Sequence, residues 1–359
     1  MEINRLRLNQ YRSYAALDLR PGPGINAIVG DNAEGKTNSV EAVFLCAFGR
    51  SHRTSRDAEL IMRGCAGGYV GAELTNNTGS HLIEIKLRDG ERKKIFIDRQ
   101  MASRSGELMG LLNVVMFAPE DLSIVKEGPA ERRLSQTHPA YYYSLQRYNS
   151  ALKQRNALLK EPDRIGPGML ETWDEQLAAL GEEIVMDRCE FIDGLSTIAY
   201  DLHKSITGGR ERLEIVYEPD IDPEDPEGIY GAMLKALDRS RAEDLRRGFT
   251  TAGPHRDDIG IALSGIDVRT FGSQGQKRTA ALSLKLSELA FIREIKEEAP
   301  VLILDDVLSE LDEGRQQLLM ESMKDCQCFL TCTSLEGLKR AGLGNMKVFR
   351  CKGGEMLPE

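Results

Sequence analysis

The segment that most restricts the fold of this chain is GDNAEGKT at residues 30–37. It fits the pattern G-x-x-x-x-G-K-[ST], follows the apolar run INAIVG and precedes a helical pattern over residues 37–48. In such a strand–loop–helix unit, backbone N–H groups of the loop and of the helix start bind phosphate oxygens. We call residues 30–37 the phosphate loop and expect it to bind a nucleoside triphosphate with Mg²⁺. The alternative is a glycine-rich turn that carries a solvated lysine.

Within this loop the side chains have separate expected tasks. The Lys36 ammonium would lie beside the β and γ phosphates, and the Thr37 hydroxyl would bind Mg²⁺. The residues expected to contact the nucleotide are Gly30, Asp31, Asn32, Ala33, Glu34, Gly35, Lys36, Thr37 and Asn38.

A second segment, VLILDD at residues 301–306, ends an apolar run in two carboxylates. A nearly continuous apolar run is typical of a buried parallel strand, and ligands bind beyond the carboxyl ends of such strands. We expect Asp305 to hold Mg²⁺ through water, and Asp306 to orient or deprotonate the attacking water. Because aspartates also end many strands that bind nothing, this interpretation depends on the phosphate loop.

A third segment, FGSQGQKRT at residues 271–279, runs into a helical pattern that continues to about residue 297. A helix start offers unpaired N–H groups that favour an anion. Since the helix start at Lys36 already serves one nucleotide, we expect Ser273 and the Gly275 amide to serve the nucleotide of a second copy. This predicts a head-to-tail dimer that holds two ATP molecules. The alternative is that Ser273 is an ordinary helix cap.

The patterning of the chain changes twice along its length. Residues 1–130 combine the phosphate loop with short strands in an antiparallel meander, residues 131–247 are mainly helical, and residues 248–359 return to an α/β pattern. The predicted fold class is α/β, a phosphate-loop core with an antiparallel β annex, split by an inserted helical subdomain.

The helical region predicts a long antiparallel hairpin of two helices. Its first helix is expected to present one face formed by Tyr141, Leu145, Tyr148 and Leu152. Two interpretations of the hairpin remain open, an arm that projects from the core or a subdomain packed on it.

The net charge of −9 over 359 residues argues against a protein that coats nucleic acid by bulk attraction. Any contact with DNA would require a local basic patch. No run approaches the roughly 18 apolar residues of a membrane span, and seven cysteines without framework spacing favour reduced thiols in the cytoplasm. Cys326 and Cys328 lie in an apolar run and are expected in the core.

Together the three segments resemble the ABC-type ATPases of the SMC class, in which such elements form composite sites across a dimer. More narrowly, the chain is similar to the RecF family of bacterial recombination mediators over nearly its whole length. The matching stretches are NQYRSY, GDNAEGKTN, SHRTSRDAELI, FAPEDLSIVKEGPAERR, AYYYSLQRYNSALKQRN, TTAGPHRDDI, SQGQKRTAALSLKLSE and LILDDVLSELD.

The resemblance implies specific roles. Lys36 and Thr37 would be the nucleotide and Mg²⁺ contacts, Asp306 the catalytic carboxylate, and Ser273 and Gln276 part of the signature. Asp312 would lie in the loop that crosses the dimer interface. A γ phosphate sensor is expected at the end of the strand FLTCT, at Thr331 or Thr333, and we choose Thr333.

The implied function is that of a weak Mg²⁺-dependent ATPase. Its ATP-bound homodimer would bind duplex DNA near single-strand gaps, with RecR and RecO as partners, no membrane and RecA loading as the outcome. The expected DNA contacts, which also fit a solvated surface loop, are Arg50, Arg53, Arg56, Lys93 and Lys94. Two other functions stay open: a soluble ATPase subunit of a transporter, and an ATP-gated structural clamp without useful turnover.

Three features depart from the family or superfamily pattern. Leu134 directly follows Glu131-Arg132-Arg133, where the family pattern would continue with several more residues. The signature reads SQGQ, with glutamine where transporter-type members have a second glycine. Asp306 replaces the glutamate of most ABC ATPases, and its shorter reach is compatible with slow hydrolysis that acts as a timer.

Overall fold

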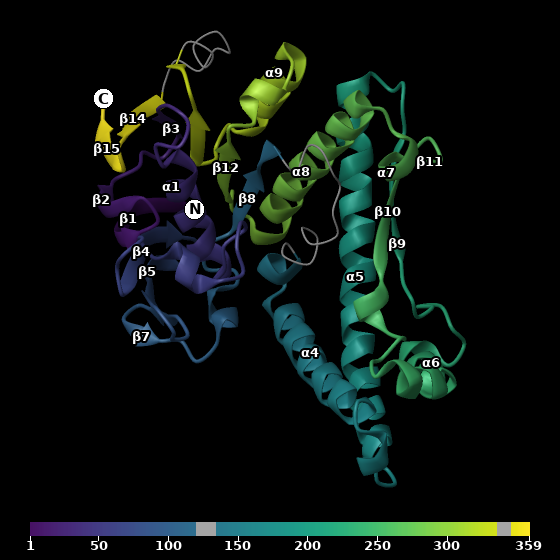
Figure 1. The fold of residues 1–359 in the computed structure, drawn as a ribbon. Helices are drawn as coiled ribbons and strands as arrows, with labels where there is room; N and C mark the ends of the chain where they lie inside the picture. Colours follow the sequence, from purple (N-terminus) through teal and green to yellow (C-terminus); the bar gives the residue numbers. More distant parts are fainter. Residues whose placement is uncertain (120–133, 336–345) are drawn as a thin grey trace. The chain divides into compact units, whose positions relative to one another are not determined.

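The computed structural model describes residues 1–119, 134–335 and 346–359 (Figure 1). Contacts between Cα atoms divide the chain into two compact units. The first unit comprises Met1–Val125, Ser205–Gly209 and Ser273–Glu359, and the second comprises Lys126–Lys204 and Arg210–Gly272. Segments from the two ends of the sequence therefore fold together in the first unit.

One sheet of the first unit is antiparallel, with strand order β2-β1-β4-β5-β6-β7. The predicted meander is confirmed, because β4, β5 and β6 pair in succession and in antiparallel fashion. The strands are β1 (Glu2–Tyr11), β2 (Tyr14–Leu19), β4 (Gly67–Asn76), β5 (Gly79–Arg88), β6 (Lys94–Ile97) and β7 (Gln100–Met101).

The other sheet of the first unit has the order β15-β14-β3-β13-β12-β8. Its strands are parallel except at the edge, where β15 pairs antiparallel with β14. The predicted buried strands at VLILD and FLTC are confirmed as β12 and β13. The bounds are β3 (Ile25–Val29), β8 (Val114–Phe117), β12 (Val301–Asp305), β13 (Cys328–Cys332), β14 (Met346–Lys352) and β15 (Glu355–Pro358).

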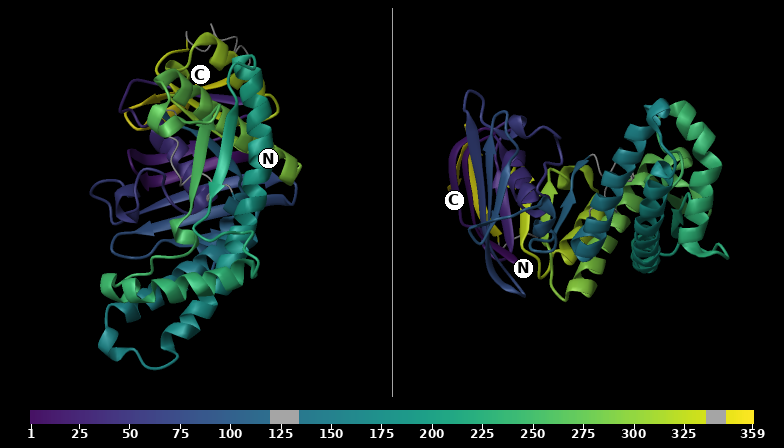
Figure 2. Two further views of the ribbon diagram at one scale, coloured as in Figure 1. Left: turned by 90° about the vertical axis from the view of Figure 1, so that its right-hand side faces the viewer. Right: turned by 90° about the horizontal axis from the view of Figure 1, so that it is seen from below.

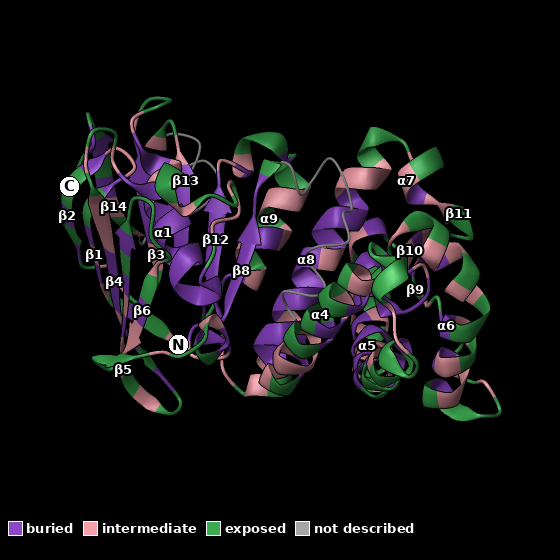
Figure 3. Cartoon of the chain, turned by 60° about the horizontal axis from the view of Figure 1, so that its bottom comes forward, coloured by how far each residue is buried: buried purple, intermediate pink, exposed green. Residues whose placement is uncertain are grey.

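Helix α1 (Lys36–Phe48) packs against strands of both sheets, β4 and β5 on one side and β8, β12 and β13 on the other. Eleven of its 13 residues are buried, and α1 is accordingly mostly purple in Figure 3. A helix enclosed in this way is apolar on nearly all sides and lacks a polar face. The other helices that the structure describes in this unit are η1 (Asp57–Leu60), η2 (Ser105–Leu108), α8 (Gln274–Lys296), η5 (Leu308–Glu310) and α9 (Glu313–Ser322).

The second unit is built on the predicted helical hairpin, which is confirmed. Helices α4 (Pro139–Leu159) and α5 (Met169–Thr207) run antiparallel. Hydrogen bonds along the pair join residues 141 to 188, 144 to 183 and 155 to 174. Figure 2 shows β9 and β10 beside α5. The other elements are η3 (Pro162–Arg164), β9 (Leu213–Glu218), α6 (Gly228–Arg247), η4 (Pro254–Arg256), β10 (Asp258–Leu263), β11 (Ile266–Asp267) and α7 (Val268–Phe271).

The structure differs from the sequence prediction at two places in this unit. Residues 248–272 group with the helical unit and not with the returning α/β half, because β10 pairs with β9 along its whole length, from Asp258↔Glu218 to Leu263↔Leu213. On α4, Leu145 and Leu152 are only half-buried, and Ala151 and Arg155 are buried instead. The junction after Arg133 and the expected boundary near residue 130 lie outside the described residues.

Among the described residues, the cysteine prediction is confirmed, since Cys326 and Cys328 are buried in the core. No helix in the described part of the chain is long and apolar enough to span a bilayer.

Candidate nucleotide site

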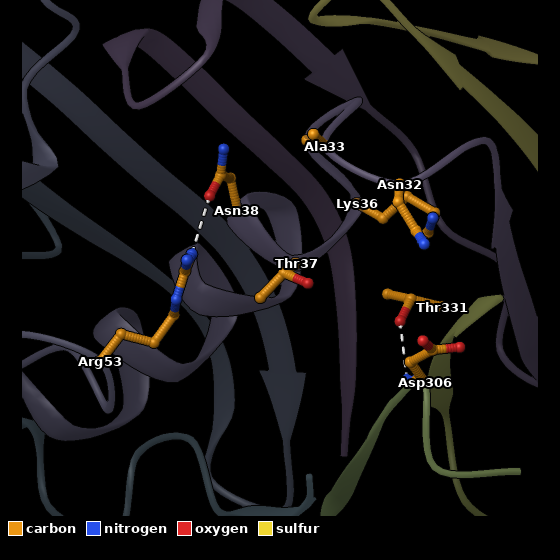
Figure 4. A pocket seen from close by; sticks show the side chains of 9 residues that line it. Asn32, Ala33, Lys36, Thr37, Asn38, Arg53, Asp306 and Thr331 are labelled. Atoms are coloured by element: carbon orange, nitrogen blue, oxygen red, sulfur yellow. Dashed lines mark hydrogen bonds between the residues drawn. The ribbon is translucent and has the colours of Figure 1, made fainter. Parts of the chain in front are cut away.

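The phosphate loop lies between β3 and α1, beyond the carboxyl end of β3. The next strands in the sheet are β13 and then β12, which end in Thr331-Cys332 and Asp305. A pocket of about 360 Å³ opens at these strand ends (Figure 4). It is lined by Asn32, Ala33, Gly35, Lys36, Thr37, Asn38, Arg53, Asp306 and Thr331. The crevice beyond the carboxyl ends of parallel strands is where α/β sheets bind ligands.

Two glycines permit the path of the phosphate loop. Gly35 has φ of 110°, and a Cβ at this position would lie 2.5 Å from Ser13 Oγ. A Cβ on Gly30 would collide with the backbone carbonyl of Cys351. The Tyr14 hydroxyl also donates a 3.0 Å hydrogen bond to the Gly35 carbonyl. The loop is thus packed closely against both β2 and β14, and any side chain at these glycines would displace it.

Lys36 is buried at the first position of α1, with 7% of its surface exposed. Its Nζ donates to the carbonyls of Gly30 at 2.7 Å and Asp31 at 2.9 Å. The N-terminus of α1 carries no side-chain cap. The positive end of the helix and the ammonium therefore act on the same pocket, and both favour an anion such as phosphate.

The acidic end of β12 meets the phosphate loop through one carboxylate. Thr37 Oγ1 donates to Asp305 Oδ1 at 3.0 Å, although these residues are 268 positions apart. Because the Thr37 proton is given to Asp305, the lone pairs of its oxygen stay available to a cation. A hydroxyl and a carboxylate are ligands that Mg²⁺ accepts together with substrate phosphates. These two residues fit the expected Mg²⁺ site.

Asp306 follows directly and lines the pocket. Its backbone adopts φ of 53°, a left-handed conformation that aspartate tolerates better than most side chains. Burial raises the pKa of the Asp306 carboxyl, and the Lys36 ammonium opposes that rise. The negative charges of Asp305 and Glu310 raise this pKa further. A carboxylate with a raised pKa is a better proton acceptor near neutral pH than an ordinary aspartate.

The signature turn, residues 273–276, begins α8 in the first unit. Ser273 caps the helix, because its Oγ accepts from the Gln276 N–H at 3.2 Å and Gln276 Oε1 accepts from the Ser273 N–H at 2.9 Å. Ser273 and Gly275 are exposed. Of the described residues that line the pocket, none belongs to the signature turn. Ser273 therefore acts as a helix cap and is also accessible from outside the molecule.

Arg315, a residue that sequence reasoning missed, connects Asp312 to the signature turn. Asp312 is exposed and caps α9 by accepting from the Arg315 N–H at 3.0 Å. The Arg315 side chain pairs with the Asp312 carboxylate and also donates to Thr279 Oγ1 at 2.5 Å and to the Gly275 carbonyl at 3.3 Å. The start of α8 and the start of α9 are thus joined by one guanidinium.

The five expected DNA contacts fall into three different settings. Arg53 lines the nucleotide pocket and donates to Asn38 Oδ1 at 3.0 Å. Lys93 is paired with Asp57, with Nζ to Oδ1 and Oδ2 distances of 2.8 and 2.9 Å. Arg50, Arg56 and Lys94 are exposed. Arg53 is exposed as well, although it lines the pocket, so four of the five are accessible to a large ligand.

Arg53 is held at the pocket by a buried carboxylate of α1 that sequence reasoning also missed. Glu41 is fully buried, accepts two hydrogen bonds from Arg12 at 2.7 and 2.9 Å, and lies 3.6 Å from Arg53. The Ser51 hydroxyl donates to Glu41 as well, at 2.5 Å. A charged residue inside the apolar run VEAVFLCAF was the available signal, since glutamate is rarely buried without partners.

Apart from the signature turn and Asp312, four expected nucleotide contacts lie outside the pocket lining, namely Gly30, Asp31, Glu34 and Thr333. Glu34 is directed to the C-terminal hairpin, where its carboxylate accepts from the Gly353 N–H. Thr333 is exposed, and Thr331, two residues earlier at the end of β13, lines the pocket instead. Gly30, Asp31 and Asn32 are the first three residues of the phosphate loop, and Asp31 and Asn32 are exposed.

Comparison with known proteins agrees with this geometry. The chain matches the family model "RecF/RecN/SMC N terminal domain" over residues 2–355. It is 41% identical to DNA replication and repair protein RecF of Clostridium perfringens, over 99% of each chain. It is 42% identical to the protein of that name from Acetivibrio thermocellus, again over 99% of each chain.

Solved structures give the same result. A structure described as the recombination mediator protein RecF-ATP in the RecFOR pathway superposes with a TM-score of 0.91 at 33% identity, covering 100% of this chain and 99% of that one. A Pyrococcus furiosus Smc head domain shares the fold, with a TM-score of 0.57 at 16% identity over 99% of this chain and 95% of its own. With both sequence and fold matched over the full length, the chain belongs to the RecF/RecN/SMC family of ABC-type ATPases, in its RecF branch.

Proposed function

We propose that this chain is a Mg²⁺-dependent ATPase of DNA repair. The observation that carries the proposal is the meeting of Lys36 and Thr37 with Asp305 and Asp306 at one edge of the parallel sheet. Phosphate positioning, cation binding and proton acceptance are the three tasks of phosphoryl transfer to water, and these residues are suited to them. The RecF relatives are named for DNA replication and repair, and one structural neighbour is described with ATP.

The proposal includes a head-to-tail homodimer that forms when ATP binds. Ser273 and Gly275 are exposed at a helix start but do not line the pocket of their own chain. Such a turn is suited to the γ phosphate of a nucleotide held by a second copy. Exposed Asp312 is joined to the same region by Arg315, so both expected interface segments would reach the partner together.

The ATP-bound dimer would hold duplex DNA near a single-strand gap in the cytoplasm, and hydrolysis would release it. Phosphate contacts would come from the exposed Arg50, Arg56 and Lys94. RecO and RecR would be the partners and RecA loading the outcome, as the RecF family membership suggests. Full-length similarity to RecF proteins gives the transporter interpretation no support.

The first experiment measures molecular mass in solution with and without ATP and Mg²⁺. The wild type should change from monomer to dimer when both are present. Lys36→Met should stay monomeric, because the variant lacks the ammonium that holds the β and γ phosphates. Ser273→Arg tests the other side of the same interface, since it should bind ATP normally and still remain monomeric. A wild type that stays monomeric with ATP would refute the composite site.

A further inference from the structure

Thr331 carries a hydroxyl that joins the two consecutive aspartates of the pocket. Its side chain is almost completely buried, at 2% exposed. Thr331 Oγ1 donates to Asp305 Oδ1 at 2.6 Å and accepts from the backbone N–H of Asp306 at 2.9 Å. Figure 4 shows the second of these bonds at the wall of the pocket. The threonine thus contacts both residues that the proposed reaction requires.

This arrangement follows from strand register. Asp305 and Thr331 are paired directly in the parallel ladder of β12 and β13, so their side chains emerge on the same face of the sheet. Thr37 reaches the same oxygen, Asp305 Oδ1, from the start of α1. Two hydroxyls therefore fix the orientation of one carboxylate, one from the phosphate loop and one from the neighbouring strand.

The hydroxyl of threonine has one proton and two lone pairs. At Thr331 the proton is used by the Asp305 carboxylate, and a lone pair is used by the Asp306 N–H. The second bond supports a strained turn, because Asp306 has φ of 53°. Valine has nearly the same shape but offers neither function, whereas serine offers both. The site therefore permits a substitution series that separates shape from hydrogen bonding.

We infer that Thr331 is a positioning residue of the ATPase site, which orients Asp305 toward Mg²⁺ and holds Asp306 in its turn. The inference rests on the proposed function and deepens it. In this role the residue acts through the two aspartates. Residues that orient a metal ligand commonly change metal affinity when they are removed.

The test compares Thr331→Val, Thr331→Ser and wild type by nucleotide binding, using a fluorescent ATP analogue titrated with Mg²⁺. Thr331→Val should raise the Mg²⁺ concentration for half-saturation about 10-fold to 100-fold. Its nucleotide affinity in EDTA should stay within about 2-fold of wild type, because the phosphate loop is intact. Thr331→Ser should restore the Mg²⁺ response, and kcat should follow the same order.

Ser287→Ala is the matched control, because it removes a buried hydroxyl from α8, bonded at 2.6 Å to the Ser283 carbonyl, outside the pocket. It should leave the Mg²⁺ response unchanged. A Thr331→Val variant with a normal Mg²⁺ response and kcat overturns the inference. The inference also fails if Thr331→Val loses nucleotide affinity both in EDTA and in Mg²⁺ and Thr331→Ser does not restore it. If the wild type itself binds no nucleotide, the proposed function fails first, and the inference fails with it.

Discussion

At the scale of single residues, the two aspartates at the end of β12 have different surroundings although they are adjacent. Asp305 faces Thr37 and Thr331, both of which donate to its Oδ1. Asp306 lines the pocket, in a left-handed turn that directs it away from the strand. The environment raises the pKa of Asp306, chiefly through burial. In the proposed reaction, Asp305 would therefore bind the cation and Asp306 would accept the proton.

Asp306→Asn tests this division and separates an enzyme from a clamp without turnover. The variant keeps the shape of the side chain but cannot accept a proton, so ATP hydrolysis should fall about 100-fold or more. The lifetime of the ATP-bound dimer should lengthen correspondingly, measured by dilution and light scattering. Asn bears no negative charge, and ATP binding itself should persist. An unchanged dimer lifetime would favour the clamp.

Sequence patterns identified some of these residues and could not identify others. Lys36, Thr37 and Asp305 belong to short motifs, and residues of a short motif can be recognised in the sequence by their fixed spacing. Arg53 was expected to contact DNA, and Thr331 was the position not chosen for the γ phosphate sensor, yet both line the pocket because β3, β13 and the loop after α1 become neighbours in the fold. A property that arises from strand order has no signal within a short segment.

At the scale of elements, the buried face of α4 was predicted nearly correctly, but the prediction missed its largest fully buried side chain. Tyr141 and Tyr148 are buried as expected, but the buried face continues through Ala151 and Arg155. Arg155 is fully buried, and it donates to Asp174 Oδ1 of α5 and to Asp244 Oδ2 of α6, each at 2.6 Å. Periodicity counts apolar residues, so it passes over an arginine that is buried through its partners.

Arg155→Met should destabilise the protein strongly, because it leaves two buried carboxylates without their shared cation. Breaking a buried ion pair from one side typically lowers the free energy of unfolding by about 3–5 kcal/mol. Arg164→Met is the matched control, since Arg164 pairs with Glu161 on the surface and its side chain is 80% exposed. That change should cost less than about 1 kcal/mol. Urea unfolding followed by circular dichroism measures both, and equal losses would contradict the assigned role.

At the scale of the whole molecule, the order of strands explains why the motifs lie so far apart. The parallel sheet takes β3 and β8 from the first part of the chain and β12, β13 and β14 from the last. The order of the motifs and the apolar runs predicted that the N-terminal and C-terminal parts of the chain fold together. The pairing of β9 with β10 could not be predicted, because α6 separates the two strands in the sequence and composition does not show which strands pair.

The net charge of the molecule also constrains how it can bind DNA. With a formal charge of −9, the protein must rely on local contacts, and Arg56 is a candidate whose side chain is 81% exposed. Arg56→Gln should weaken duplex binding in the presence of ATP and Mg²⁺, and should do so equally for different sequences. The slope of log K against log salt should become shallower by about 1, as expected for one lost phosphate contact.

Arg212→Gln provides the matched control for this experiment. Arg212 is similarly exposed, at 69%, but it lies at the start of β9 in the second unit and pairs with Glu214. Its removal should leave the salt slope unchanged, because Arg212 is not an expected phosphate contact. Since both variants lose one positive charge, the comparison separates a local contact from total charge. Equal effects of the two substitutions would show that duplex binding depends only on total charge. A loss of affinity in Arg56→Gln that varies with DNA sequence would indicate a base contact. Either result would contradict a phosphate contact by the loop after α1.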